Sequence, residues 1–166
     1  MKRFLSAASM IVLSLILIGC GHDTREGLIQ DTVVMMNAAS TQVKNIADRV
    51  KEATDRYKAD SKKGLDLADA IKAAEELKKT GNKAQEIKRA IELYRAQITN
   101  DDQKINTEKQ RGDLNAAFKK LVERKNDLRA ALNDAEKLDN GKEKAKVDAL
   151  REKIVEAEGP YEALTR

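Results

Sequence analysis

The sequence predicts an all-α fold, an elongated antiparallel bundle of coiled-coil-like helices that follows an N-terminal signal peptide. Three observations lead to this prediction. Charged residues make up 36% of the chain, aromatic residues only 3%, and there is one proline among 166 residues, a composition typical of long helices. Apolar residues recur three or four positions apart, which is the period of an amphipathic helix. Glycine, asparagine and aspartate residues separate these stretches, as turn-forming residues do.

Residues 1–19 have the pattern of a secretory signal peptide. Lys2 and Arg3 precede an apolar stretch over residues 4–18, in the order that such signals require. A membrane-spanning helix would need about 20 apolar residues, whereas this stretch is shorter and is interrupted by serines. We therefore expect residues 1–19 to be cleaved off. Loss of Lys2 and Arg3 would halve the net charge of +4.

The end of the apolar stretch, Leu17-Ile18-Gly19-Cys20, resembles the processing site of bacterial lipoproteins. The resemblance implies cleavage between Gly19 and Cys20, a diacylated Cys20 thiol and an acylated new amine. Two or more acyl chains anchor a protein stably, so the expected partner is the membrane, through lipid on Cys20. Gly21 stands where an aspartate would retain many lipoproteins in the inner membrane. A glycine at this position resembles the pattern of lipoproteins that are exported to the outer membrane. The resemblance implies that the chain faces the periplasm.

A long helix is expected to begin soon after Cys20. Residues 20–27 comprise the lipidated cysteine and a short tether, in which Asp23 and Glu26 have the spacing of a helix cap and its partner. The helix is predicted over residues 24–62, about 60 Å at about 1.5 Å per residue. Its apolar residues alternate at four and three positions, the coiled-coil period. The helix-packing seam defined by this period comprises Ile29, Val33, Met36, Val43, Ala47, Val50 and Tyr57.

This seam has two interpretations. It can form the core of the chain's own bundle, which is usual for apolar stripes of helical period. It can also dock against a second copy of the chain or against another envelope protein, since the register is kept over about four heptads.

Shorter helices follow within a helical domain that spans residues 28–158. Gly64 is expected to end the first helix, and Asp66 to cap a second over residues 66–79. Gly81 is expected to terminate that helix in a left-handed conformation, with a third helix over residues 83–106.

Two further helices are expected after a break at about residues 106–113. Ile105 and Leu114 fall on opposite faces of one straight helix, and Gly112-Asp113 lies between them, so a fourth helix is predicted over residues 113–138. A turn at Asp139-Asn140-Gly141 leads to a fifth over residues 142–158. Gly159-Pro160 is expected to close it, leaving residues 159–166 as a loosely held tail.

The chain offers little that resembles a catalytic or metal site. His22 is the only histidine and adjoins the expected lipid site, whereas metals need several converging ligands. Asn100-Asp101-Asp102 lacks the glycine and glutamate of a calcium loop. Arg111-Gly112-Asp113 spells an adhesion tripeptide, but a helix boundary explains it as well. Acidic and basic residues are mixed along the chain and aromatic residues are few, so we expect no nucleic-acid partner. We expect no enzyme activity and no cofactor.

With its processing signal and charged heptad helix, the chain resembles small helical envelope lipoproteins of double-membrane bacteria, of which the murein lipoprotein is the best-known member. That protein ends in a lysine joined to peptidoglycan, whereas this chain ends Leu164-Thr165-Arg166 and Lys153 lies within the last helical segment. The resemblance implies a lipid-anchored, non-enzymatic scaffold, spacer or protein-interaction module. The alternative is a periplasmic lipoprotein that binds a small apolar ligand or acts as an inhibitor-like binder.

Overall fold

The computed structural model describes residues 25–97, 108–138, 142–162 and 164, and this part of the chain is helical without strands. It contains four long helices and one short one, in the order α1 (Arg25–Ala59), η3 (Ser61–Lys63), α2 (Ala68–Gln97), α3 (Glu108–Glu136) and α4 (Lys144–Glu162). The prediction of an all-α helical bundle is confirmed.

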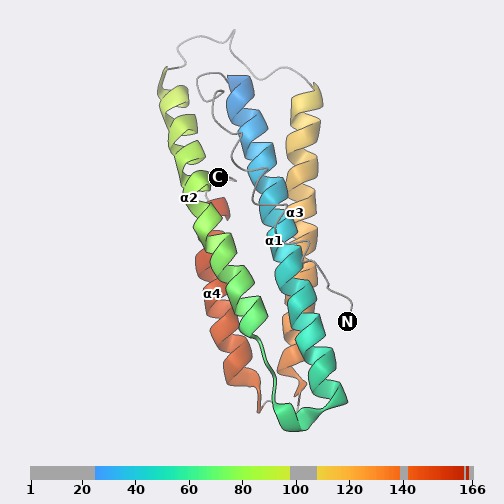
Figure 1. Ribbon diagram of the computed structural model, residues 1–166. Helices are drawn as coiled ribbons and strands as arrows, with labels where there is room; N and C mark the ends of the chain where they lie inside the picture. The colour runs from blue at the N-terminus through green and yellow to red at the C-terminus, as the bar shows by residue number, and fades with distance from the viewer. Residues whose placement is uncertain (1–24, 98–107, 139–141, 163, 165–166) are drawn as a thin grey trace, which may run out of the picture.

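The helices run alternately in opposite directions along one axis (Figure 1), so α1 is parallel to α3, and α2 is parallel to α4. The most extensive contact joins α1 to its parallel neighbour α3, and α1 also packs along α2. Helix α4 packs mainly on α2 and only slightly on α3. Helix α1 is therefore the central element, and α4 is the outer one.

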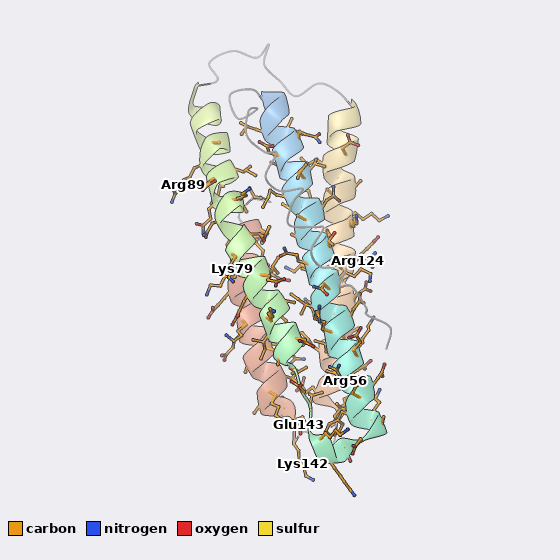
Figure 2. All side chains as sticks on the ribbon, in the orientation of Figure 1. Arg56, Lys79, Arg89, Arg124, Lys142 and Glu143 are labelled. Atoms are coloured by element: carbon orange, nitrogen blue, oxygen red, sulfur yellow. The ribbon has the colours of Figure 1, made fainter. Side chains whose placement is uncertain are left out.

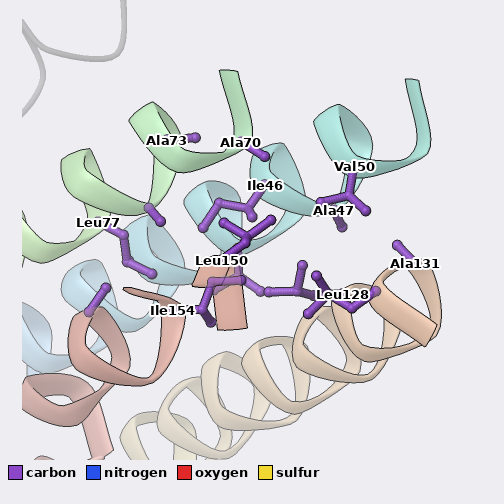
Figure 3. Close-up of a cluster of buried hydrophobic side chains, with 14 of the residues drawn as sticks. Ile46, Ala47, Val50, Ala70, Ala73, Leu77, Leu128, Ala131, Leu150 and Ile154 are labelled. Atoms are coloured by element: carbon purple, nitrogen blue, oxygen red, sulfur yellow. The ribbon is translucent and has the colours of Figure 1, made fainter. Parts of the chain in front are cut away.

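The core is a narrow column of small and medium-sized side chains. Helix α1 has Met35, Met36 and Ile46 fully buried, and Figure 3 shows Ile46 beside residues of α2, with Leu150 and Ile154 of α4 filling the space between the helices. Alanines are numerous on the facing helices, which lets the backbones approach closely. The buried alanines of α2 and α3 are Ala70, Ala73, Ala74, Ala84, Ala117, Ala131 and Ala135.

The start of α2 agrees with the predicted cap, whereas the end of α1 comes earlier than expected. Asp66 Oδ1 accepts a hydrogen bond from the Ala68 amide at 3.0 Å, which satisfies one free donor of the first turn. Helix α1 ends at Ala59, and Gly64 instead follows η3, with a φ of 70°. A left-handed φ is strained for residues with a Cβ, so glycine suits this turn.

The predicted helix break at Gly81 is wrong. Helix α2 runs unbroken from Ala68 to Gln97, so the expected helices over 66–79 and 83–106 are one helix as far as the described residues reach. Gly81 is buried, and a Cβ built on it would lie 3.0 Å from Pro160 Cγ and 3.2 Å from Pro160 Cβ. Glycine is present because α4 lies against α2 there, which the local turn rules do not anticipate.

The predicted start of a helix at residue 113 is also wrong. Helix α3 already begins at Glu108 and continues through Gly112, which is exposed, with no atom within 4 Å of an added Cβ. One glycine inside a helix costs only about 1 kcal/mol, and packing of the rest of α3 on α1 outweighs it. Helices α2 and α3 are separate and antiparallel (Figure 1), and the intervening residues 98–107 lie outside the described part.

Helix α4 continues beyond the expected stop at Gly159-Pro160. It ends at Glu162 with Pro160 inside it, and Leu164 packs against the core, so the prediction of a loose tail from residue 159 is wrong for residues 159–162 and for Leu164. Tyr161 is only 3% exposed. The side chain before a proline normally clashes with the proline ring, and Gly159 has none. Burial of Tyr161 then holds the last turn in place.

Ion pairs match the parallel register of α4 on α2. Lys78 Nζ lies 2.7 Å from Glu156 Oε2, and Lys153 Nζ lies 3.6 Å from Glu75 Oε1. The hydrogen bond from Lys78 lowers the pKa of Glu156 below its usual value. Exposed pairs contribute little stability, so they assist the register more than they hold the helix. Figure 2 shows the charged side chains projecting outward around the bundle, among them Lys79, Arg89 and Arg124.

Gly81 and Gly112 provide a matched test of the role of tertiary packing. We predict that Gly81→Leu lowers the free energy of unfolding by about 1–3 kcal/mol, because the new side chain must displace Pro160. Gly112→Leu, on an exposed face, is predicted to raise it by up to about 1 kcal/mol, because leucine favours helix. Urea unfolding followed by circular dichroism measures both. Equal effects of the two substitutions would contradict the close approach of α4 to Gly81.

Candidate functional site

The predicted lipidation site lies outside the described residues. Gly19, Cys20 and His22 all precede Arg25, the first residue of α1. Lipid on Cys20 therefore stays a prediction from the sequence. What the structure does place is the first helix residue, which follows Cys20 within a few positions.

The predicted helix-packing seam lies mostly inside the chain's own bundle. Val33 is partly buried against the core, Ile29 is half-buried, and the other five seam residues are buried. Side chains that are covered within one chain are not available to a second one. Burial of these five residues therefore agrees with the interpretation of the seam as an internal core. They are Met36, Val43, Ala47, Val50 and Tyr57.

A second buried stripe on α1 was missed from the sequence. Figure 3 shows one of its residues, Ile46, beside α2, whereas a two-stranded coiled-coil pattern assigns only one face of a helix to packing. The apolar character of these positions is visible in the sequence, and a wider search at helical period would find them. The stripe comprises Leu28, Met35, Ala39, Ile46 and Ala53.

A cavity of about 280 Å³ lies beside the end of α4 and is lined by all four long helices. Helix α4 ends there at Glu162, whereas α2 continues well beyond Gly81, the residue opposite Pro160. Most of its wall is apolar, and its polar groups come from α3 and α4. The lining residues are Ala39, Val43, Leu77, Phe118, Leu121, Val122, Lys125, Glu158, Tyr161 and Glu162.

Lys125 and two glutamates form a charged cluster at this cavity. Lys125 Nζ lies 3.0 Å from Glu158 Oε2 and 2.8 Å from Glu162 Oε1. Burial alone would lower the pKa of Lys125, but the hydrogen bonds and the charges of Glu162 and Glu158 outweigh it, so the pKa is raised. The ammonium therefore stays charged and is paired with both carboxylates.

Tyr161 connects α4 to the interior of α2. Its hydroxyl donates a hydrogen bond to the Leu77 carbonyl at 3.2 Å and is also hydrogen-bonded to the Thr80 hydroxyl. Burial raises the pKa of the phenol, while the Thr80 hydrogen bond lowers it by less. Thr80 lies in turn 3.3 Å from Gln42 Oε1 on α1. The Tyr161 side chain thus couples α4 to α2.

Other kinds of site are not supported in the described ranges. Within residues 25–97, 108–138, 142–162 and 164, no group of three or more His, Cys, Asp or Glu residues is placed to hold a metal ion. Over the same ranges, no helix combines the length and the apolarity that crossing a membrane would require.

The Tyr161 hydroxyl gives a pH-dependent prediction. Since its folded-state pKa is above the ordinary value of 10.0, the unfolded tyrosine loses its proton first as pH rises, and folding becomes less favourable above that pH. Tyr161→Phe is expected to be less stable than the wild type by about 0.5–1.5 kcal/mol at neutral pH. The difference should shrink above pH 10, as measured by urea unfolding at several pH values. A difference that does not change with pH would contradict burial of the phenol.

Comparison with known proteins adds no family assignment. No protein-family model matches the chain, and searches of curated proteins and of solved structures find no match either.

Proposed function

We propose that this chain is a lipid-anchored, non-enzymatic helical protein of the bacterial cell envelope that acts as a scaffold or spacer for another envelope protein. The observation that carries the proposal is the sequence Leu17-Ile18-Gly19-Cys20 at the end of an apolar stretch with a basic start. Acylation at Cys20 would hold the chain on a membrane surface without a spanning helix. The sorting pattern at Gly21 favours the outer membrane, facing the periplasm.

The shape of the bundle supports a spacing role. Helix α1 has 35 residues, about 50 Å at about 1.5 Å per residue, and it starts within a few residues of Cys20. The short helix η3 and the start of α4 lie at the opposite end of the bundle (Figure 1). An upright anchored chain would therefore present that opposite end about 50 Å from the membrane surface.

The opposite end also has the surface that a protein partner needs. Lys62 and Lys63 are exposed there, and the Gly64 turn gives the connection a defined conformation. Arg56, Lys142 and Glu143 lie at the same end (Figure 2). Mixed charges on an ordered turn provide specificity to a contact without a catalytic group. We propose that this end, named here the distal end, contacts the partner.

The lipid anchor is tested by replacing Cys20. In cells that express the full-length chain, the wild type is expected to incorporate labelled palmitate and to start at an acylated Cys20 by mass spectrometry. Cys20→Ala should incorporate no label and keep residues 1–19, because cleavage depends on the acylated thiol. His22→Ala is the matched control and should behave as the wild type. An unlabelled wild-type chain would refute the anchor.

The distal contact is tested by crosslinking in intact cells. A photoreactive residue in place of Lys62 is expected to give a discrete crosslinked product, because that position lies at the distal end. The same residue in place of Lys79, which projects from the side of α2 (Figure 2), should give little. Products of equal yield from both positions, or none from position 62, would argue against a contact at the distal end.

A further inference from the structure

The cavity beside the end of α4 is a mostly apolar space of limited size. Val43 of α1 and Leu77 of α2 line it and are buried, and Phe118 and Leu121 contribute the larger side chains of α3. Its volume is about 280 Å³, whereas an apolar cavity of about 150 Å³ accommodates benzene. Drug-sized ligands occupy about 300–1,000 Å³. The space therefore suits a molecule that is larger than benzene and smaller than a drug.

The cavity also leaves apolar surface in contact with water. The Val122 side chain is 55% exposed, although it lines the cavity together with the partly buried Phe118. Within the described residues the only other large apolar side chain exposed to this degree is Val155, at 70%, which is not part of the lining. An apolar molecule that lay across Phe118 and Val122 would remove this surface from water, which is favourable.

The polar groups of the cavity wall are already paired within the protein. The Tyr161 hydroxyl donates to the Leu77 carbonyl at 3.2 Å, and Lys125 Nζ lies 3.0 Å from Glu158 Oε2 and 2.8 Å from Glu162 Oε1. In the part of the chain that the structure describes, none of the buried side-chain atoms that lack a hydrogen-bond partner belongs to a residue of this wall. A polar group on a bound molecule would lose its hydrogen bonds to water and gain no unpaired buried partner in return. The wall therefore favours a neutral, apolar occupant.

We propose that this cavity binds a small neutral hydrocarbon with one aromatic ring and a short alkyl chain. Phe118 and Tyr161 both line the cavity, in a chain of which only 3% is aromatic, and an aromatic ring packed against them gains attraction beyond its buried area. The alkyl chain adds contact with Leu121 and Val122. The inference goes beyond the scaffold role and is independent of the lipid anchor, since none of these residues belongs to the segment that contains Cys20.

The site is tested by photolabelling in membranes of cells that express the full-length chain. The probe is a phenyl diazirine, an uncharged aromatic ring with a photoreactive group, and the labelled residues are mapped by mass spectrometry. Saturable labelling of α3 near Phe118 and Val122 is expected, because the probe matches the cavity in size and polarity.

Two competitors of similar length isolate the preference for an apolar molecule. At equal free concentrations in water, butylbenzene is expected to compete with the probe at least about tenfold better than N-ethylbenzamide. The amide group of the second compound must leave water without an unpaired partner in the cavity, and a difference of about 1.4 kcal/mol is tenfold in affinity.

Two exposed valines give a matched pair of variants. Val122→Trp places an indole at the cavity and should reduce labelling at least about tenfold, because the indole occupies the space itself. Val155→Trp adds the same ring away from the cavity and should leave labelling unchanged. Both positions are exposed, so circular dichroism should show the wild-type fold.

The same variants provide a second readout, because the wild-type chain contains no tryptophan. The fluorescence emission of Val122→Trp is expected at shorter wavelength than that of Val155→Trp, since only the first indole leaves water. The proposal is overturned if labelling of α3 is not saturable, if N-ethylbenzamide competes as well as butylbenzene, or if Val122→Trp and Val155→Trp are labelled alike.

Discussion

The bundle depends on burial of α1 on two faces at once. One stripe of buried residues includes Met36 and Val50, another includes Ile46, which Figure 3 shows beside α2, and α1 packs on both α3 and α2. With few aromatic residues, the remaining core consists mainly of aliphatic side chains and alanines. The area buried per residue is small, so long continuous contact along α1 must provide most of the stability. A rod-like shape follows from a core of this kind.

Helix α4 is held by buried side chains along its length, Val147, Leu150, Ile154 and Ala157, and by further contacts at its end. Gly81 admits Pro160 next to the α2 backbone, and the buried Tyr161 hydroxyl bonds to the Leu77 carbonyl. The exposed ion pairs along the same interface are weak in water. The cavity lies beside this end of α4 and is lined by all four long helices.

The fold class and most helix positions could be predicted from the sequence, because apolar periodicity is a local property. Asp66 was recognised as a cap for the same reason, since capping involves only neighbouring residues. The three glycines at 64, 81 and 112 show where such reasoning fails. Gly64 lies in a turn with positive φ, Gly81 permits close helix packing, and Gly112 is inside an exposed helix face. Only tertiary contacts distinguish them.

The candidate functional residues also differ in whether the sequence alone can reveal them. Cys20 is recognised from a linear signal, and no structure is needed to propose its acylation. The Lys125, Glu158 and Glu162 cluster could not be found from the sequence, because it joins α3 to the end of α4, and a proline at position 160 predicts that this end is not helical. A chain with 28 acidic residues contains many carboxylates, and only the fold shows which of them adjoin an apolar cavity.

The central claim, that α1 is buried within its own chain, is tested most directly by native-state hydrogen exchange. Amides around Val43 and Val50 are expected to exchange only through global unfolding, with the slowest rates in the protein. These rates should be the same at low and high protein concentration, because no second chain covers this helix. Protection of α1 that rises with protein concentration would instead place the seam between chains and contradict the account.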